Sequence, residues 1–272
     1  MEYSINIHYI AKTMPMSKAA QLVSEAGFTA LDYTPPVTDD NWEHVMEEHM
    51  QIFAENHLHV HQTHAPFNRY NHHGNRHRLL VERALQATKM LNAAYMVVHG
   101  DEFDFKNIEY TPPKALEYNN DYFAPYVEKA AAFNIGIAFE NVFEDAGRPR
   151  FCSDVTELKA LIERFQTPNV SCCWDFGHAN VAFGQTQPDK IAEIAKYISC
   201  THIHDNYYGK DLHLPPFFGE IDWEACMQVL QKAGYSGNLS FEFVYGALPE
   251  SLAKDYLKNF YCTGVLLGEM LA

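Results

Sequence analysis

Basic residues are scarce in this chain, and their scarcity argues against several classes of partner. The 272 residues include 20 Lys and Arg against 35 Asp and Glu, which gives a formal net charge of −15 at pH 7. Nucleic acids and anionic membranes are polyanions, so a general affinity for either is not expected. A pocket that is locally basic or lined by metal could still bind an anionic group against this average.

Membrane segments and disulfide frameworks are also lacking. No apolar run reaches membrane-spanning length, and the first residues, Met-Glu-Tyr-Ser-Ile, show no charged leader followed by an apolar stretch. The six cysteines form no C-x-x-C pair and no dense framework, so disulfides are not expected. These absences predict a soluble protein of the reducing cytoplasm. The sequence leaves open whether protomers associate into a homo-oligomer.

Strand-like runs alternate with amphipathic stretches eight times, and no low-complexity linker interrupts them. The expected strands cover residues 4–8, 28–33, 58–63, 94–99, 136–141, 170–175, 198–204 and 239–243. The expected helices cover residues 17–26, 42–55, 77–91, 114–133, 154–165, 188–196, 223–233 and 252–267. Several strands are continuous apolar runs, which are typical of parallel strands covered on both faces. We therefore predict an α/β protein with a single (β/α)8 TIM-barrel domain over residues 1–272.

A doubly wound open sheet is the alternative fold. Such a sheet normally carries a Gly-rich phosphate-binding turn after its first strand. This chain has Ile7-His8-Tyr9-Ile10-Ala11 at that place, which contains no glycine. The barrel is therefore the preferred prediction.

His, Asp and Glu side chains stand where expected strands end, or in the loops just after them. There are nine of them: His64, His99, Glu140, Asp175, His178, His202, Asp211, His213 and Glu242. Imidazole and carboxylate are ligands of Zn²⁺, Mn²⁺ and related ions. In a TIM barrel the carboxyl ends of all eight strands meet at one face, so residues far apart in sequence can share a metal. The pattern predicts a metal-dependent enzyme.

Structural roles compete with this interpretation. Glu140 and Glu242 follow apolar runs, and a buried carboxylate needs a cation, a metal or solvent as a partner. Alternation places His202 and His204 on the same face of one strand, so one is expected to ligate a metal while the other orients substrate or packs as a core histidine. Hydrogen-bonded structural histidines are the alternative for His64 and His99, and a plain surface loop is the alternative for residues 211–213.

Three motifs carry a family resemblance. They are W-D-F-G-H at residues 174–178, H-I-H-D-N at 202–206, and D-L-H-L-P-P at 211–216 followed by G-E-I-D-W at 219–223. These motifs resemble the xylose-isomerase-like TIM-barrel superfamily, which includes sugar isomerases, keto-sugar 3-epimerases and endonuclease-IV-type AP endonucleases. The resemblance spans nearly the whole chain.

The resemblance implies two sets of ligands. Glu140, Asp175, His202 and Glu242 match the ligands of the single divalent metal in the epimerases, and His178 matches their substrate-binding histidine. The remaining ligands of the trinuclear zinc site of the AP endonucleases are matched by His64, His99, His178, Asp211 and His213. One to three Zn²⁺ or Mn²⁺ ions per chain are therefore expected.

Two reactions fit these ligands. In the first, a small sugar or sugar phosphate is isomerised or epimerised through a metal-held enediolate, with Glu140 and Glu242 as the acid and base that the resemblance implies. In the second, a multinuclear zinc site hydrolyses a phosphodiester. The full set of nine ligands favours the second, whereas the net charge of −15 and the lack of Lys- and Arg-rich loops favour the first. The sugar enzyme is preferred, and a metal- or sugar-binding module without turnover is a third option.

Substrate contacts are predicted from several side-chain types. His178, His204 and Trp174 are expected to contact the sugar, and the locally basic segment that holds Arg69 is expected to meet a phosphate group. Aromatic faces at the mouth could also pack on a sugar, with Tyr9, Phe67 and Phe218 as further candidates. Core packing is the alternative for each of these aromatic residues.

Overall fold

The strands form one parallel sheet that curls into a barrel. A computed structural model describes residues 1–67, 75–144, 147–246 and 248–272. The strand order is β7-β6-β5-β4-β3-β2-β1-β8, and every paired neighbour is parallel. The strands are β1 Tyr3–Asn6, β2 Ala30–Tyr33, β3 His59–His64, β4 Tyr95–His99, β5 Gly136–Glu140, β6 Val170–Asp175, β7 Ile198–His202 and β8 Leu239–Phe241.

The last gap in the barrel lies between β7 and β8. A parallel bridge between Ile203 and Phe241 joins these two strands just beyond the end of β7. The Ile203 N–H donates to the Ser240 carbonyl at 2.7 Å, and the Glu242 N–H donates to the Ile203 carbonyl at 3.1 Å. The predicted TIM barrel is confirmed.

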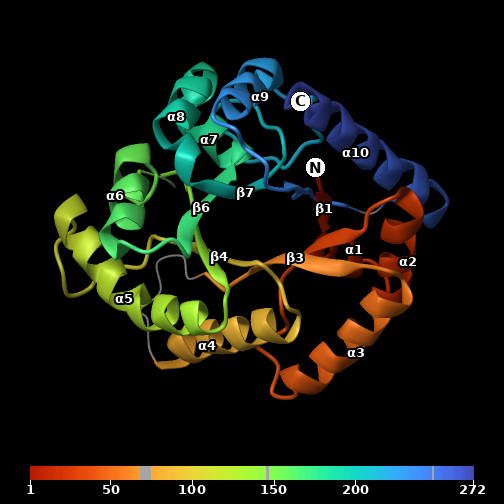
Figure 1. The fold of residues 1–272 in the computed structure, drawn as a ribbon, viewed down its shortest axis with the longest axis horizontal. Coiled ribbons are helices and arrows are strands. Elements are labelled where there is room, and N and C mark those ends of the chain that lie inside the picture. The colour runs from red at the N-terminus through yellow and green to blue at the C-terminus, as the bar shows by residue number, and fades with distance from the viewer. Residues whose placement is uncertain (68–74, 145–146, 247) are drawn as a thin grey trace.

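Helices surround the strands as an outer ring (Figure 1). They are α1 Ile7–Ala11, α2 Met16–Ala26, α3 Trp42–Glu55, α4 Asn75–Met90, α5 Pro112–Ala132, α6 Val155–Phe165, α7 Phe176–Phe183, α8 Gln187–Ile194, α9 Trp223–Lys232 and α10 Glu250–Met270. Short 3-10 turns at Gly184–Thr186 and Ala195–Tyr197 flank α8. Within the described ranges, no helix is long and apolar enough to cross a membrane.

Two short helices differ from the sequence prediction. The first strand was expected to reach residue 8, but it ends at Asn6, whose side-chain oxygen accepts the His8 N–H at 3.1 Å and caps α1. Likewise, Asp175 ends β6 and caps α7 by accepting the His178 N–H at 2.6 Å. An Asn or Asp at the end of a strand thus starts a helix without a connecting loop.

Alternation along the strands separates two apolar layers. Most buried apolar side chains pack between the sheet and the helices. A small second cluster, Val97, Ala138, Cys173 and Cys200, fills the inside of the barrel. Because side chains two positions apart share a face, the next residues on the inner face are His99, Glu140, Asp175 and His202. The barrel interior therefore changes from an apolar plug to a charged layer at the carboxyl ends of the strands.

Candidate metal centre and active site

Glu140 lies at the centre of the charged layer. Its Oε2 lies 3.1 Å from His64 Nε2 and 3.0 Å from His99 Nε2, and its Oε1 lies 2.9 Å from His202 Nδ1. Burial alone would raise the pKa of this carboxyl. The charge of His202 and the hydrogen bonds from His202 and His64 outweigh burial and hold the pKa well below its usual range. Glu140 is therefore an anion despite being almost completely buried.

His202 is enclosed by carboxylates on both sides. Its Nδ1 faces Glu140 and also lies 3.2 Å from Glu242 Oε2, while its Nε2 lies 2.9 Å from Asp32 Oδ2. Burial alone would lower the pKa of His202, but the charges of Glu140 and Glu242 and the hydrogen bond to Asp32 raise it well above its usual value. A protonated His202 would balance the negative charge of these carboxylates. A divalent cation could balance the same charge from the Nδ1 side.

Asp32 is a site residue that the sequence prediction missed. Its Oδ2 also accepts from Gln62 Nε2 at 2.9 Å and from the Ser240 hydroxyl at 3.3 Å. A metal-ligating histidine usually donates its other ring N–H to such an acceptor, which fixes the ring and its tautomer. The sequence feature that could have identified Asp32 is a charged residue inside an otherwise apolar strand, Ala30-Leu31-Asp32-Tyr33.

In the part of the chain that the structure describes, four groups of side chains are close enough to hold a metal ion. In each group the ligand atoms lie within 4.8 Å of one another: Glu140, Asp175, His202 and Glu242; His64, His99 and Glu140; Asp175, His178 and His204; and His204, Asp211 and His213. The structure thus brings all nine predicted ligand residues into one layer. The first group offers three carboxylates and one imidazole, a donor set that suits a divalent ion.

Asp211 and His213 reach the layer from the loop between β7 and α9. His213 Nε2 lies 3.5 Å from Asp211 Oδ1, and His178 Nε2 lies 4.0 Å from Asp211 Oδ2. Burial would lower the pKa of His213, but the hydrogen bond to Asp211 and the charge of Glu242 raise it to about 9. That these residues hold a metal remains a prediction.

Asp205 anchors this loop, a role that the sequence prediction also missed. Its two carboxylate oxygens accept from the backbone N–H groups of Phe217 at 2.9 Å and Ile221 at 3.2 Å and from Trp223 Nε1 at 3.0 Å. The nearby position 219 has no room for a side chain larger than that of glycine, because a Cβ on Gly219 would lie 2.2 Å from Asp205 Oδ1. The buried carboxylate therefore ties the loop that carries Asp211 and His213 to the barrel.

His204 lies behind the metal-ligand candidates instead of at the mouth. It has no exposed surface, its Nε2 lies 3.0 Å from Asp175 Oδ1, and its ring stacks on His213 with 3.9 Å between centroids. Burial, followed by the charge of His213, lowers the pKa of His204 to about 3, so the ring is neutral. Burial, reinforced by the charge of Glu140, raises the pKa of Asp175 to about 7. The expected direct contact between His204 and substrate is wrong, because the ring is enclosed by protein.

The other predicted substrate contacts have different outcomes. Trp174 is wrong as a substrate contact, because alternation along β6 turns it outward into the sheet–helix core, where it is fully buried. His178 does lie in the charged layer, where its Nδ1 donates to the Asn141 carbonyl at 3.0 Å. Arg69 lies outside the described residues.

A hollow opens above the charged layer. It has a volume of about 290 Å³ and is lined by Asn6, His8, Tyr9, Lys12, Thr34, His64, Ala65, Pro66, Phe67 and Glu242. Phe67 stacks on His99 with 4.3 Å between centroids while 47% of its surface remains exposed. Phe218 is 65% exposed but does not line this hollow. The hollow is of the size that a small sugar requires, and Lys12 is a lining cation that the sequence prediction did not single out.

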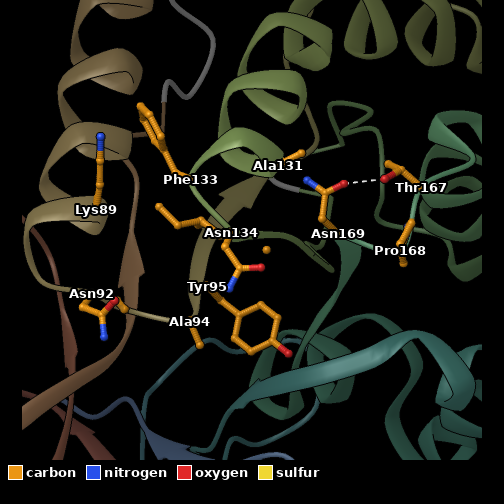
Figure 2. Close-up of a pocket in the computed structure, with 13 residues that line it drawn as sticks. Lys89, Asn92, Ala94, Tyr95, Ala131, Phe133, Asn134, Thr167, Pro168 and Asn169 are labelled. Atoms are coloured by element: carbon orange, nitrogen blue, oxygen red, sulfur yellow. Dashed lines mark hydrogen bonds between the residues drawn. The ribbon is translucent and has the colours of Figure 1, made fainter.

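A larger hollow lies at the other end of the barrel. Its volume is about 870 Å³, and it is bounded by the residues that precede β4, β5 and β6. Figure 2 shows Tyr95, Asn134 and Asn169 around it. None of the four candidate metal-binding groups found among the described residues borders it. In TIM barrels chemistry takes place at the carboxyl ends of the strands, so the smaller hollow is the candidate active site.

Comparisons with known proteins reveal relatives in sequence and in fold. An uncharacterized protein, y4fM, of Sinorhizobium fredii is 26% identical over an alignment of 294 positions that spans 92% of this chain and 88% of that protein. The structure of a D-tagatose 3-epimerase-like protein matches with a TM-score of 0.77 and 22% identity, covering all of both chains. That of a family 2 AP endonuclease from Brucella melitensis matches with a TM-score of 0.74 and 18% identity, covering 96% of this chain and 98% of that one.

The two structural matches share so little sequence that they establish only the fold. A family model described as xylose isomerase-like TIM barrel matches residues 20–260. This protein belongs to the xylose isomerase-like TIM-barrel family.

Proposed function

We propose that this protein is a metal-dependent isomerase or epimerase that acts on a small sugar or sugar phosphate. One observation carries the proposal: Glu140 and Glu242, at the ends of β5 and β8, both face His202 Nδ1, at 2.9 and 3.2 Å. Two glutamates held around one point beneath a small hollow suit the transfer of a proton to and from a bound substrate.

Glu140, Asp175, His202 and Glu242 would hold the divalent ion. When bound, such an ion supplies a Lewis acid that polarises substrate oxygens and makes an adjacent C–H more acidic. His202 suits this role, because its Nε2 N–H is directed to Asp32 and its Nδ1 would release its proton to present a lone pair to the ion.

Glu242 and Glu140 differ in their access to substrate. Glu242 lines the hollow and keeps 14% of its side chain exposed, whereas Glu140 is 1% exposed beneath His64 and His99. Glu242 is therefore the better placed of the two to remove a proton from a substrate carbon. Glu140 is the partner carboxylate on the barrel side, and Tyr9 and Phe67 offer apolar faces to the sugar.

A metal-dependent phosphodiesterase is the alternative. The gathering of all nine predicted ligand residues in one layer favours it. The sequence has 20 basic residues against 35 acidic ones, and among the described residues that line the hollow Lys12 is the only Lys or Arg. A duplex substrate needs many such cations along its backbone, so the sugar reaction is the better supported of the two.

The experiment is an exchange assay in D₂O. The purified protein, loaded with Mn²⁺ or Zn²⁺, is incubated with a panel of ketoses, aldoses and their phosphates, and the sugars are analysed by NMR. The expected result is metal-dependent incorporation of deuterium at a carbon that bears a hydroxyl. The same preparation is tested on a duplex that contains an abasic site. Nicking of that duplex without exchange into any sugar would replace this proposal with the phosphodiesterase.

A further inference from the structure

Each histidine of the charged layer has one ring nitrogen that faces the candidate metal ligands and a second that faces away from them. The partner of the second nitrogen separates these histidines into two kinds. A histidine that ligates through one nitrogen carries its proton on the other, and that proton needs an acceptor. Four of the site histidines have such an acceptor. The acceptors are the backbone carbonyls of Ala65 for His64, Asn141 for His178 and Glu242 for His213, at 2.8, 3.0 and 3.2 Å, and the Asp32 carboxylate for His202, at 2.9 Å.

His99 has the opposite arrangement. Its Nδ1 lies 3.3 Å from Arg150 Nη2, and a guanidinium group carries donors only. Nδ1 must therefore present its lone pair to Arg150, which places the ring proton on Nε2. That nitrogen lies 3.0 Å from Glu140 Oε2, which accepts the proton. Both neighbours of the ring thus require the same tautomer, and that tautomer has no lone pair directed into the metal layer.

Arg150 is fixed in this position by its own contacts. It is 3% exposed, its Nε donates to Asp101 Oδ2 at 2.6 Å, and its Nη1 donates to the Phe143 carbonyl at 3.4 Å. Turning the guanidinium away from His99 would disturb a buried ion pair, and uncompensated buried charge is costly. An arginine does not lose its proton in a protein, so it remains a donor to His99 at every working pH.

We infer that Arg150 is a positioning residue that keeps His99 as its Nε2–H tautomer and so excludes His99 from metal ligation. His99 then serves as a hydrogen-bond donor that holds Glu140 Oε2 and leaves Glu140 Oε1 for the group with Asp175, His202 and Glu242. The group of His64, His99 and Glu140 loses one of its three ligands and does not bind an ion. This inference rests on the proposed function only for the assignment of that four-residue group.

Metal counting provides the first test. Wild-type protein and His99→Gln are saturated with Zn²⁺, desalted and analysed for zinc per chain. Glutamine can donate to Glu140 and accept from Arg150, so His99→Gln should bind as many ions as wild type with the same affinity. His202→Gln, which removes a ligand of the four-residue group, should lower the count. A loss of one zinc per chain in His99→Gln would overturn the inference.

The tautomer itself provides a readout that a purely structural role would not change. Long-range ¹H–¹⁵N NMR of the imidazole rings distinguishes the two tautomers, and the His99 signals are those missing from His99→Gln. We expect the Nε2–H form both without metal and with Zn²⁺. The Nδ1–H form in wild type, or a zinc-bound Nε2, would contradict the inference.

Arg150→Met tests the cause. With the guanidinium removed, Asp101 is left as an acceptor near His99, the ring should adopt the Nδ1–H form, and the zinc count should rise by one per chain. A folded Arg150→Met protein that keeps the Nε2–H form would contradict the role of Arg150. If the variant does not fold, the comparison of wild type with His99→Gln still decides whether His99 is a ligand. None of these measurements depends on turnover, so a failure of the sugar proposal is seen separately.

Discussion

At the scale of single residues, the direction of a hydrogen bond decides what each site histidine can do. His202 donates through Nε2 to Asp32 and so presents Nδ1 to Glu140 and Glu242. The ring is fully buried and cannot adopt another orientation without losing its contact with Asp32. Asp32 thereby fixes the orientation of the His202 ring from outside the group of metal-ligand candidates.

We therefore predict that Asp32→Asn lowers metal affinity. The amide keeps the size of the carboxylate but loses its charge, so it holds the His202 N–H less firmly. Changes to such outer partners typically cost about 10- to 100-fold in metal affinity. Competition titration with a metal-sensitive dye measures the change, and Asp39→Asn, at an exposed position, is the matched control. Equal affinities of Asp32→Asn and wild type would show that Asp32 does not support the metal centre.

The two glutamates provide a second prediction at this scale. Glu140→Gln and Glu242→Gln should keep the fold, weaken metal binding and lower kcat by about 10²- to 10⁴-fold, the range typical of a lost acid or base. Metal analysis and the exchange assay in D₂O measure both effects, with Glu224→Gln on α9 as the control. Unchanged metal content and unchanged activity in both variants would refute the assignment.

At the scale of elements, strand ends and the loops that follow them build the site. The strands deliver His99, Glu140, Asp175 and His202 by alternation alone, whereas Asp211 and His213 depend on the shape of a long loop. Asp205 fixes that loop through its contacts with Phe217, Ile221 and Trp223.

Asp205→Ala should therefore destabilise the protein and misplace His213. The change leaves several buried donors without an acceptor, at a cost of about 3 kcal/mol in the free energy of unfolding. Asp222→Ala is the matched control, because it also replaces an Asp that accepts backbone N–H groups. Asp222 caps α9 by accepting the Ala225 N–H at 2.9 Å. Loss of such a cap costs about 1 kcal/mol. Urea denaturation measures both values, and an equal loss in the two variants would contradict the anchoring role.

Short helices were the elements that the sequence could not predict. Residues 7 and 8 continue an apolar run and were assigned to the first strand, but α1 begins there because Asn6 caps it. Residues 176–183 follow β6 directly and offer only two turns of helical periodicity, so α7 was not expected. The longer helices were predicted nearly in full because their periodicity extends over several turns.

At the scale of the whole molecule, the pH dependence of stability should reflect Glu157 on the first turn of α6. Burial raises the pKa of its carboxyl to about 7. The folded state thus binds this proton more tightly than the unfolded chain, in which a Glu titrates near ~4.3. Its stabilising contribution is complete below the unfolded pKa and is lost as the pH rises through about 7.

Glu157→Gln should remove that loss, because glutamine stays neutral at every pH. We expect the Tm of wild type to fall relative to that of Glu157→Gln between about pH 5 and pH 8, over the range set by this pKa shift. Thermal unfolding at both pH values measures the difference, with the exposed Glu47→Gln as the control. A difference between the two proteins that does not vary with pH would contradict the role of Glu157.

The fold and the ligand set were predictable from the sequence to different degrees. Eight repeated strand and helix units identify the barrel, and the barrel in turn predicts that ligands at strand ends meet. The roles of Asp32 and Arg150 were not predictable, because they depend on contacts across the chain. Asp32 meets Gln62 and Ser240, which lie 30 and 208 positions away in the sequence. Trp174 was misassigned because a motif shows where a residue lies along a strand. It does not show whether the side chain points into the barrel or into the core between the sheet and the helices.

The claim on which the rest depends is that the ends of β5 to β8 form a metal centre. Its most direct test is an anomalous difference map from crystals grown with Mn²⁺, recorded near the manganese absorption edge. We predict a peak within coordinating distance of Glu140, Asp175, His202 and Glu242. A map with no peak at that position, or with its manganese held by other residues, would contradict the claim.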